Sequence, residues 1–253
     1  MMDFNELKDF LDFKVKQYNQ QEFIINDPIS IPKRFKKKED IEIAAFLAAS
    51  LSWGNRSAII KASGQLLNLM DNDPYEFLTK AGSSDLNRFR KFVYRTFNGY
   101  DAIFFMESLK RIYVEYSGLE NVFNEGFDGT IISSLIHFRS VFMRNQEVRT
   151  GKHVANVLKK SSAKRLNMFL RWMIRDDHAG VDFGLWKKIS PSVLQLPLDL
   201  HTGNVSRKLG LLKRQQNDWK SVEAVTSELI KMDPEDPVKY DFALFGLGIF
   251  EKF

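Results

Sequence analysis

The chain has 253 residues, of which 44% are hydrophobic and 13% aromatic, and this supports a substantial core in one large domain or two smaller lobes. It contains no cysteine, which excludes disulfides, thiolate zinc sites, cysteine-ligated iron–sulfur clusters and thiol nucleophiles. Its 37 basic side chains outnumber its 32 acidic ones, and the formal charge of +5 favours a polyanionic partner such as nucleic acid.

The N-terminal residues 1–13 carry acids and no apolar run of signal-peptide length. No later segment approaches the roughly 20 apolar residues that a membrane span requires. We therefore expect a cytoplasmic, monomeric protein with no membrane contact and no cofactor. An oxygen-rich loop at Asp176, Asp177, His178 and Asp182 lacks the spacing of a metal site, so no bound metal is expected either.

Apolar residues recur at intervals of three and four along the first half of the chain, the period of an amphipathic helix. Two such helices, over 43–51 and 59–70, are separated by Trp53-Gly54-Asn55. Asp73-Pro74 indicates the start of another helix, with aspartate at the N-cap and proline at the first helical position. The same period predicts further helices over 86–97, 102–116 and 130–142.

The second half repeats this pattern, with helices predicted over 166–174, 200–209, 221–232 and 237–250. Gly210 follows the second of these helices, as is common just after a helix C-terminus. Nowhere does strict alternation of apolar and polar residues persist, and strand signals are too short to build a sheet. The sequence therefore predicts an all-α fold.

A helical wheel at about 100° per residue places Lys164, Met168, Arg171 and Arg175 on one stripe. This stripe is mostly basic and is expected to point away from the core, either as a solvated face or as a contact for phosphate. Further basic residues precede it or lie beside it, namely Lys159, Lys160 and Arg165. Charge at a helix N-terminus, where backbone amides are also free, is suited to phosphate.

Asp199 immediately precedes the helix predicted over 200–209, so by itself it indicates an N-cap. The surrounding string is more informative: Leu196-Pro197-Leu198-Asp199-Leu200-His201-Thr202, then Val205, Arg207 and Leu209-Gly210-Leu211. This string resembles the segment of helix-hairpin-helix DNA glycosylases that carries the catalytic aspartate. The resemblance implies that Asp199 is that residue.

The segment 163–169 is similar to the lysine-bearing segment of the archaeal 8-oxoguanine glycosylase branch of that superfamily. It places the nucleophilic lysine at Lys164, 35 positions before Asp199. The glycine-rich hairpin that usually precedes this lysine is absent, and Lys160-Ser161-Ser162-Ala163 stands in its place. Upstream, residues 47–53 resemble the early helix pair whose turn approaches DNA beside the damaged base.

The resemblance implies a single two-lobed helical domain of the helix-hairpin-helix glycosylase type, with an atypical hairpin. One lobe, formed by both chain ends (about 1–40 and 185–253), is expected to pack against a central helical lobe (about 41–184). The whole chain also resembles a bacterial family whose function is unassigned. The resemblance therefore supports the fold more strongly than the activity.

The implied activity is that of a DNA repair glycosylase and abasic-site lyase that removes an oxidised purine from damaged duplex DNA. Asp199 would stabilise the developing sugar cation, and Lys164 would attack C1′ and form a Schiff base. That attack requires the pKa of the lysine to fall toward about 7, which desolvation and a neighbouring Arg171 or Arg165 could bring about.

DNA contacts are expected from nine residues, namely Trp53, Asn55, Arg56, Ser161, Ser162, Arg165, Arg171, His201 and Arg207. A base pocket could be walled by aromatic rings. The candidates, for each of which core packing is the alternative, are Trp53, Trp172, Trp186 and His201.

Three other functions fit the same residues. In a monofunctional glycosylase Asp199 would activate water and Lys164 would only contact phosphate. A nucleic-acid-binding protein could retain the fold without catalysis, and an RNA-directed role is equally compatible, since basic and aromatic side chains do not distinguish ribose from deoxyribose.

Overall fold

The computed structural model describes residues 2–144 and 149–253. Met1 and residues 145–148, which belong to the predicted lobes 1–40 and 41–184, lie outside the described residues. The structure is 63% helix and 2% strand, which confirms the all-α class. Within the described ranges, no helix is both long enough and apolar enough to cross a membrane.

The internal contacts divide the chain into two compact units. The terminal unit consists of residues 1–25 and 156–253, and the central unit consists of residues 26–155. Both chain ends thus belong to one unit. The lobe boundaries drawn from the sequence, near residues 40 and 185, lie further along the chain than the boundaries of these units.

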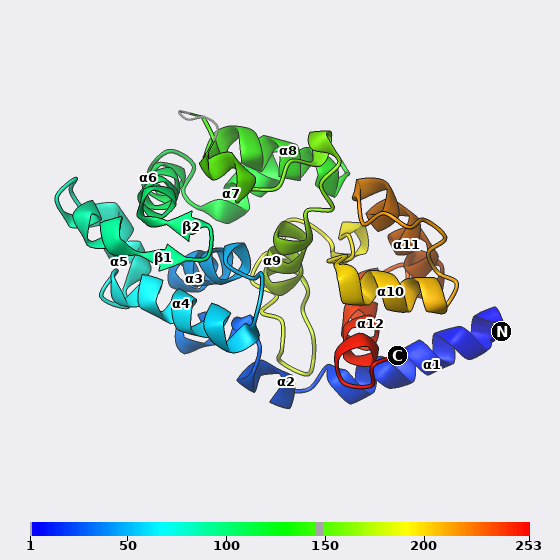
Figure 1. Cartoon of the computed structure of the whole chain (residues 1–253). Coiled ribbons are helices and arrows are strands. Elements are labelled where there is room, and N and C mark those ends of the chain that lie inside the picture. Colours follow the sequence, from blue (N-terminus) through cyan, green and yellow to red (C-terminus); the bar gives the residue numbers. More distant parts are fainter. Residues whose placement is uncertain (1, 145–148) are drawn as a thin grey trace. The chain divides into compact units, whose positions relative to one another are not determined.

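In the terminal unit, helices from the two ends of the chain pack together (Figure 1). Its helices are α1 (Phe4–Tyr18), α2 (Glu22–Ile25), α9 (Lys164–Ile174), α10 (Leu200–Lys208), α11 (Trp219–Met232) and α12 (Tyr240–Ile249). Both α1 and α10 pack on α12. A capping box between Asp3 and Glu6 fixes the start of α1.

The central unit is built around α3, which is buried along almost its whole length. Its regular elements are α3 (Lys38–Ser50), α4 (Arg56–Asn68), α5 (Pro74–Lys80), β1 (Val93–Tyr94), β2 (Phe97–Asn98), α6 (Gly99–Glu115), α7 (Leu119–Glu125) and α8 (Ile131–Phe142). Phe46 of α3 packs against Phe105, Phe138 and Phe142 with ring centroids 5.3 to 5.8 Å apart. All four rings are buried and form part of the core of this unit.

Short 3-10 helices connect the α-helices of both units: η1 (Pro28–Ser30), η2 (Pro32–Arg34), η3 (Asp85–Lys91), η4 (Thr150–Lys152), η5 (Val157–Lys159), η6 (Pro191–Val193) and η7 (Pro237–Lys239). The predicted helix starting at Pro74 is confirmed, although the Asp73 carboxylate makes no capping bond to it. Gly210 has a φ of +81°, as expected of a glycine after a helix C-terminus.

The helix predicted over 86–97 is wrong. The structure has η3 there, followed by an antiparallel pair of two-residue strands in which Val93 faces Asn98 and Tyr94 faces Phe97. The buried Phe89, Phe92 and Phe97 gave the misleading spacing. A 3-10 turn also repeats every three residues, so the apolar period did not distinguish it from an α-helix.

Candidate active site

Lys164 is the first residue of α9, directly after a turn with unusual backbone geometry. Lys160 and Ala163 both adopt the left-handed conformation, with φ of 66° and 49°. The Ser161 hydroxyl accepts a hydrogen bond from the Ala163 amide at 3.2 Å. Glycine adopts the left-handed conformation most readily, so two non-glycine residues of this turn take a backbone conformation that is strained for them.

Asp199 caps the N-terminus of α10, as its position in the sequence predicted. Its Oδ1 accepts hydrogen bonds from the amides of His201 at 2.9 Å and Thr202 at 3.0 Å. The Asp199 amide donates in turn to the Thr202 hydroxyl at 2.8 Å, which completes a capping box. These capping bonds use Oδ1 and orient the carboxylate, so that Oδ2 remains available to Lys164.

The turn before α9 and the cap of α10 bring Lys164 and Asp199 together. Lys164 Nζ lies 3.9 Å from Asp199 Oδ2, and 26% and 25% of the two side chains are exposed. The ammonium also lies 3.6 Å from the sulfur of Met168. An amine and a carboxylate that are adjacent, preorganised and still open to solvent form the chemical core of this candidate site.

Several predicted DNA-contacting residues surround this pair within the terminal unit. Ser161 and Ser162 lie in the turn before Lys164, and Asn167 donates to the Ser162 carbonyl at 3.2 Å. His201 is exposed in the first turn of α10. Arg165 is half-buried, and this burial lowers the pKa of its guanidinium to about 10.

Three of the predicted contacts, Trp53, Asn55 and Arg56, belong to the central unit. Asn55 caps α4 by accepting from the amides of Ser57 and Ala58. Trp53 is half-buried, and its ring stacks on His153 with centroids 5.6 Å apart. Trp53 and Asn55 therefore have structural roles in the turn that joins α3 to α4.

Two proposed wall residues of a base pocket lie in the core of the terminal unit instead. Trp172 and Trp186 are 0% and 1% exposed, and Trp186 meets Phe169 edge to face at 5.4 Å between centroids. For these two tryptophans, the core-packing alternative is the arrangement observed.

The basic stripe on α9 does not point away from the core as the sequence predicted. Arg171 and Arg175 are each 4% exposed. Arg171 binds Asp241 through Nη1 and lies 3.3 Å from Asp182 through Nε. A helical wheel gives only the direction of a side chain, and here that direction leads into a buried group of carboxylates.

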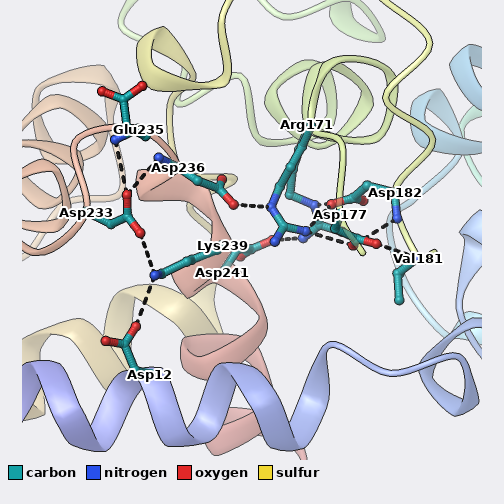
Figure 2. A network of polar contacts seen from close by, with 11 residues as sticks. Asp12, Arg171, Asp177, Val181, Asp182, Asp233, Glu235, Asp236, Lys239 and Asp241 are labelled. Atoms are coloured by element: carbon teal, nitrogen blue, oxygen red, sulfur yellow. Dashed lines mark hydrogen bonds and ion pairs between the residues drawn. The ribbon is translucent and has the colours of Figure 1, made fainter. Parts of the chain in front are cut away.

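Arg175 extends this buried ion-pair network, and Figure 2 shows its partners Asp177, Asp182 and Asp236 beside Arg171. Its guanidinium contacts Asp177 at 2.8 Å and Asp182 at 3.0 Å through Nη1, and Asp236 at 2.8 Å through Nε. Asp177 and Asp182 come from the oxygen-rich loop that follows α9, and arginine occupies their oxygens. Among the described residues, no group of three or more histidine or acidic side chains is arranged to hold a metal ion.

Asp241 is paired with Arg171, and the charges of Lys164 and Asp199 also act on it. Burial raises the pKa of the Asp241 carboxyl to about 6, and the charges of Asp199 and Asp182 add to this rise, whereas Arg171 and Lys164 oppose it. Asp241 was not among the site residues predicted from the sequence. A detectable signal was present, because Asp241 is the one acid in the otherwise apolar stretch 240–250.

The charge of Arg171 is offset by Asp182 and Asp241, so Arg171 is not the unpaired neighbouring cation that was expected to help deprotonate Lys164. The ion pairs of Arg171 and Arg175 instead join α9 to carboxylates of the segments that contain Asp182, Asp236 and Asp241.

Comparison with known proteins identifies one family. Residues 27–250 match the family described as "Protein of unknown function (DUF2400)", and the chain therefore belongs to that family. This agrees with the expected resemblance to a family of unassigned function. No curated protein matches the chain, and no solved structure does so either.

Proposed function

We propose that this protein is a DNA repair glycosylase and abasic-site lyase of the helix-hairpin-helix superfamily that removes an oxidised purine. One observation carries the proposal: Lys164 Nζ and Asp199 Oδ2, which the sequence resemblance selected 35 positions apart, lie 3.9 Å from each other. Their partial exposure is compatible with access by a large substrate.

The chemistry requires both groups. When the bond from C1′ to the base breaks, its electrons leave with the base and positive charge develops on the sugar. The Asp199 carboxylate, held by the amides of α10, would stabilise that charge without having to reorganise. The neutral amine of Lys164 would then form a bond to C1′, and ring opening would give a Schiff base from which the 3′ phosphate leaves by β-elimination.

Basic residues before α9 support a phosphate contact in this proposal. Lys159 and Lys160 are exposed and lie on the turn that precedes Lys164. Phosphate neutralisation by lysine and arginine releases counterions and dominates the affinity of most proteins for DNA. DNA bound at this turn would bring its sugars close to Lys164.

The experiment is borohydride trapping on duplexes that carry an abasic site or one of a panel of oxidised and alkylated bases. We expect the wild type to form a covalent adduct, Lys164→Gln to form none, and Asp199→Asn to form it at least about 100-fold more slowly. The matched control is Lys16→Gln, which removes an exposed lysine of α1 that has no part in the proposed site and is expected to trap as the wild type does. Full trapping by Lys164→Gln would exclude Lys164 as the nucleophile.

The ion pair also favours a second candidate, a monofunctional glycosylase. Lys164 Nζ lies 3.9 Å from the Asp199 carboxylate, and this arrangement is also compatible with a lysine that contacts phosphate and takes no part in bond formation. Base release without any trapped adduct would support this function, with Asp199 activating water. If Asp199→Asn retains DNA binding and changes no DNA-dependent activity, the protein is a non-catalytic binding module.

A further inference from the structure

Arg207, at the end of α10, organises the loop that follows it. Its guanidinium donates from Nε to the Arg214 carbonyl at 2.6 Å, and from Nη2 to the Gln215 carbonyl at 2.8 Å and to Asn217 Oδ1 at 2.5 Å. We call residues 214–219 the clasp loop. These bonds engage Arg207 within its own unit and fix both the loop backbone and the orientation of the Asn217 amide.

The Asn217 amide then reaches Asp199. Its Nδ2 donates to the Asp199 backbone carbonyl at 2.9 Å, while its Oδ1 accepts from Arg207. Both polar atoms of the Asn217 side-chain amide are thus hydrogen-bonded. A backbone carbonyl fixed in this way restrains the residue that carries the candidate carboxylate.

The far end of the clasp loop holds the turn that leads to Lys164. The Trp219 amide donates to the Lys160 carbonyl at 3.1 Å, and Ser161 forms an isolated antiparallel bridge with Asp218. Asp218 itself caps α11 by accepting from the Ser221 amide. One short loop therefore contacts both segments that carry the candidate pair.

Gly203 gives a second, independent indication of this close approach. A Cβ at position 203 would lie 2.7 Å from Asn217 Oδ1 and 3.1 Å from Asn217 Nδ2. Glycine inside a helix costs roughly 1 kcal/mol relative to alanine, so a local reason for it is expected. The reason here is space for the Asn217 amide against α10.

We propose that Asn217, held by Arg207 and accommodated by Gly203, is a positioning residue that fixes Asp199 relative to Lys164. This inference rests on the proposed function for its catalytic consequence. The geometric part stands separately, because the clasp loop would restrain Asp199 whatever reaction the site performs. Small displacements of preorganised groups reduce rates steeply, since the reacting atoms must meet within a fraction of an ångström.

The test compares Asn217→Asp with Asn217→Ala. The aspartate variant keeps an oxygen for Arg207 but loses the donor to the Asp199 carbonyl, whereas the alanine variant loses both contacts. We expect both variants to shift the carbonyl ¹³C resonance of Asp199 and to speed exchange of the His201 and Thr202 amides. We expect the trapping rate to fall about 10- to 100-fold in both, with DNA affinity within about twofold of the wild type.

A matched control comes from the same loop. Gln215→Ala removes an exposed side chain and leaves the backbone carbonyl to which Arg207 donates. It is expected to leave the Asp199 resonance, the two exchange rates and the trapping rate unchanged. A loss in this variant equal to that of Asn217→Asp would mean that any disturbance of the loop matters, which would overturn the specific role of Asn217.

A double-mutant cycle tests the role assigned to Gly203. Gly203→Ala alone is expected to displace the Asn217 amide and to slow trapping about as much as Asn217→Ala does. Adding Gly203→Ala to Asn217→Ala should cost little more, because the closest neighbour of the new methyl group is gone and only Arg207 Nη1, 3.1 Å away, remains near it. Such non-additivity is the signature of direct contact. Fully additive losses would contradict the assigned contact.

The outcomes separate this inference from the proposed function. If the wild type traps no DNA, the proposed lyase function fails. The Asp199 resonance and the amide exchange rates would still test whether Asn217 of the clasp loop restrains Asp199. If Asn217→Asp traps at the wild-type rate and leaves the Asp199 carbonyl resonance unmoved, the positioning role is wrong while the catalytic proposal stands.

Discussion

Asp241 is a buried carboxyl whose pKa is shifted by its surroundings. It is 6% exposed and binds Arg171, yet burial raises the pKa of its carboxyl from 3.8 to about 6. A carboxyl with a raised pKa binds its proton more tightly in the folded state than in the unfolded state. Its contribution therefore favours folding below pH 4 and is lost as pH rises through about 6.

Asp241→Asn removes this titration. The stability of the wild type relative to the variant should decline by on the order of 2–3 kcal/mol between pH 4 and pH 7, with most of the change near pH 4 to 6. Urea unfolding of both proteins at a series of pH values measures the difference, from which titrations common to both cancel. A relative stability that rises with pH over this range would show that Arg171 holds the carboxylate charged throughout.

Individual residues differ in how far the sequence could identify them. Asp199 was found because a cap leaves a local signature and its flanking string is distinctive. Arg171 was assigned to the surface because its partners, Asp182 and Asp241, come from segments 11 and 70 positions away. A side chain's charge is visible in a sequence, but the partner that allows it to be buried is not.

At the scale of elements, the long helices were predictable because each buries one apolar stripe. The hairpin at 93–98 was not predictable, because its strands have two residues each and Arg95, with a φ of 53°, stands where a glycine or asparagine would have given a signal. The turn before α9 was missed in its detail for the same reason. Lys160 and Ala163 adopt left-handed conformations, which lysine and alanine do not predict.

Ala163 provides a test of that turn. Ala163→Gly should change the free energy of unfolding by less than about 0.5 kcal/mol, because relief of left-handed strain is offset by the greater freedom of glycine in the unfolded chain. Ala163→Val should lower it by about 2 kcal/mol or more, since Ala163 is 2% exposed and a β-branched residue resists positive φ.

Chemical unfolding of these two variants is compared with that of Ala58→Val, an exposed position in the first turn of α4. The control is expected to cost well under about 1 kcal/mol, the helix propensity difference alone. An equally small cost for Ala163→Val would be incompatible with a left-handed, buried residue at the start of α9.

At the scale of the whole molecule, α1 and α12, which come from opposite ends of the chain, pack together in the terminal unit. Lys239 lies 3.1 Å from Asp12 of α1 and 2.5 Å from Asp233, so α1 is tied to the polar groups beside the ion-pair network (Figure 2). Tyr18 and Phe250 stack with ring centroids 5.5 Å apart. Periodicity along the sequence cannot reveal such pairings, because it describes each helix separately.

Gly246 of α12 lies in close contact with the Tyr18 ring of α1. A Cβ there would lie 2.2 Å from Cδ2 of the Tyr18 ring, so Gly246→Ala should push α1 away from α12 and cost about 1–3 kcal/mol. Amide exchange followed by mass spectrometry should show faster exchange in α1 and α12. Exchange in α6 and α8 should be unchanged, because the contacts that hold these helices lie within the central unit.

Pairing Gly246→Ala with Tyr18→Ala separates this cause from a general weakening of α12. Tyr18→Ala alone loses the stacking on Phe250, but in its presence the new methyl group meets no ring, so the double variant should exchange no faster than Tyr18→Ala. If Gly246→Ala instead speeds exchange equally in α6 and α8, the two units unfold as one cooperative body. Local opening of α1 and α12 in the terminal unit would then also open helices of the central unit.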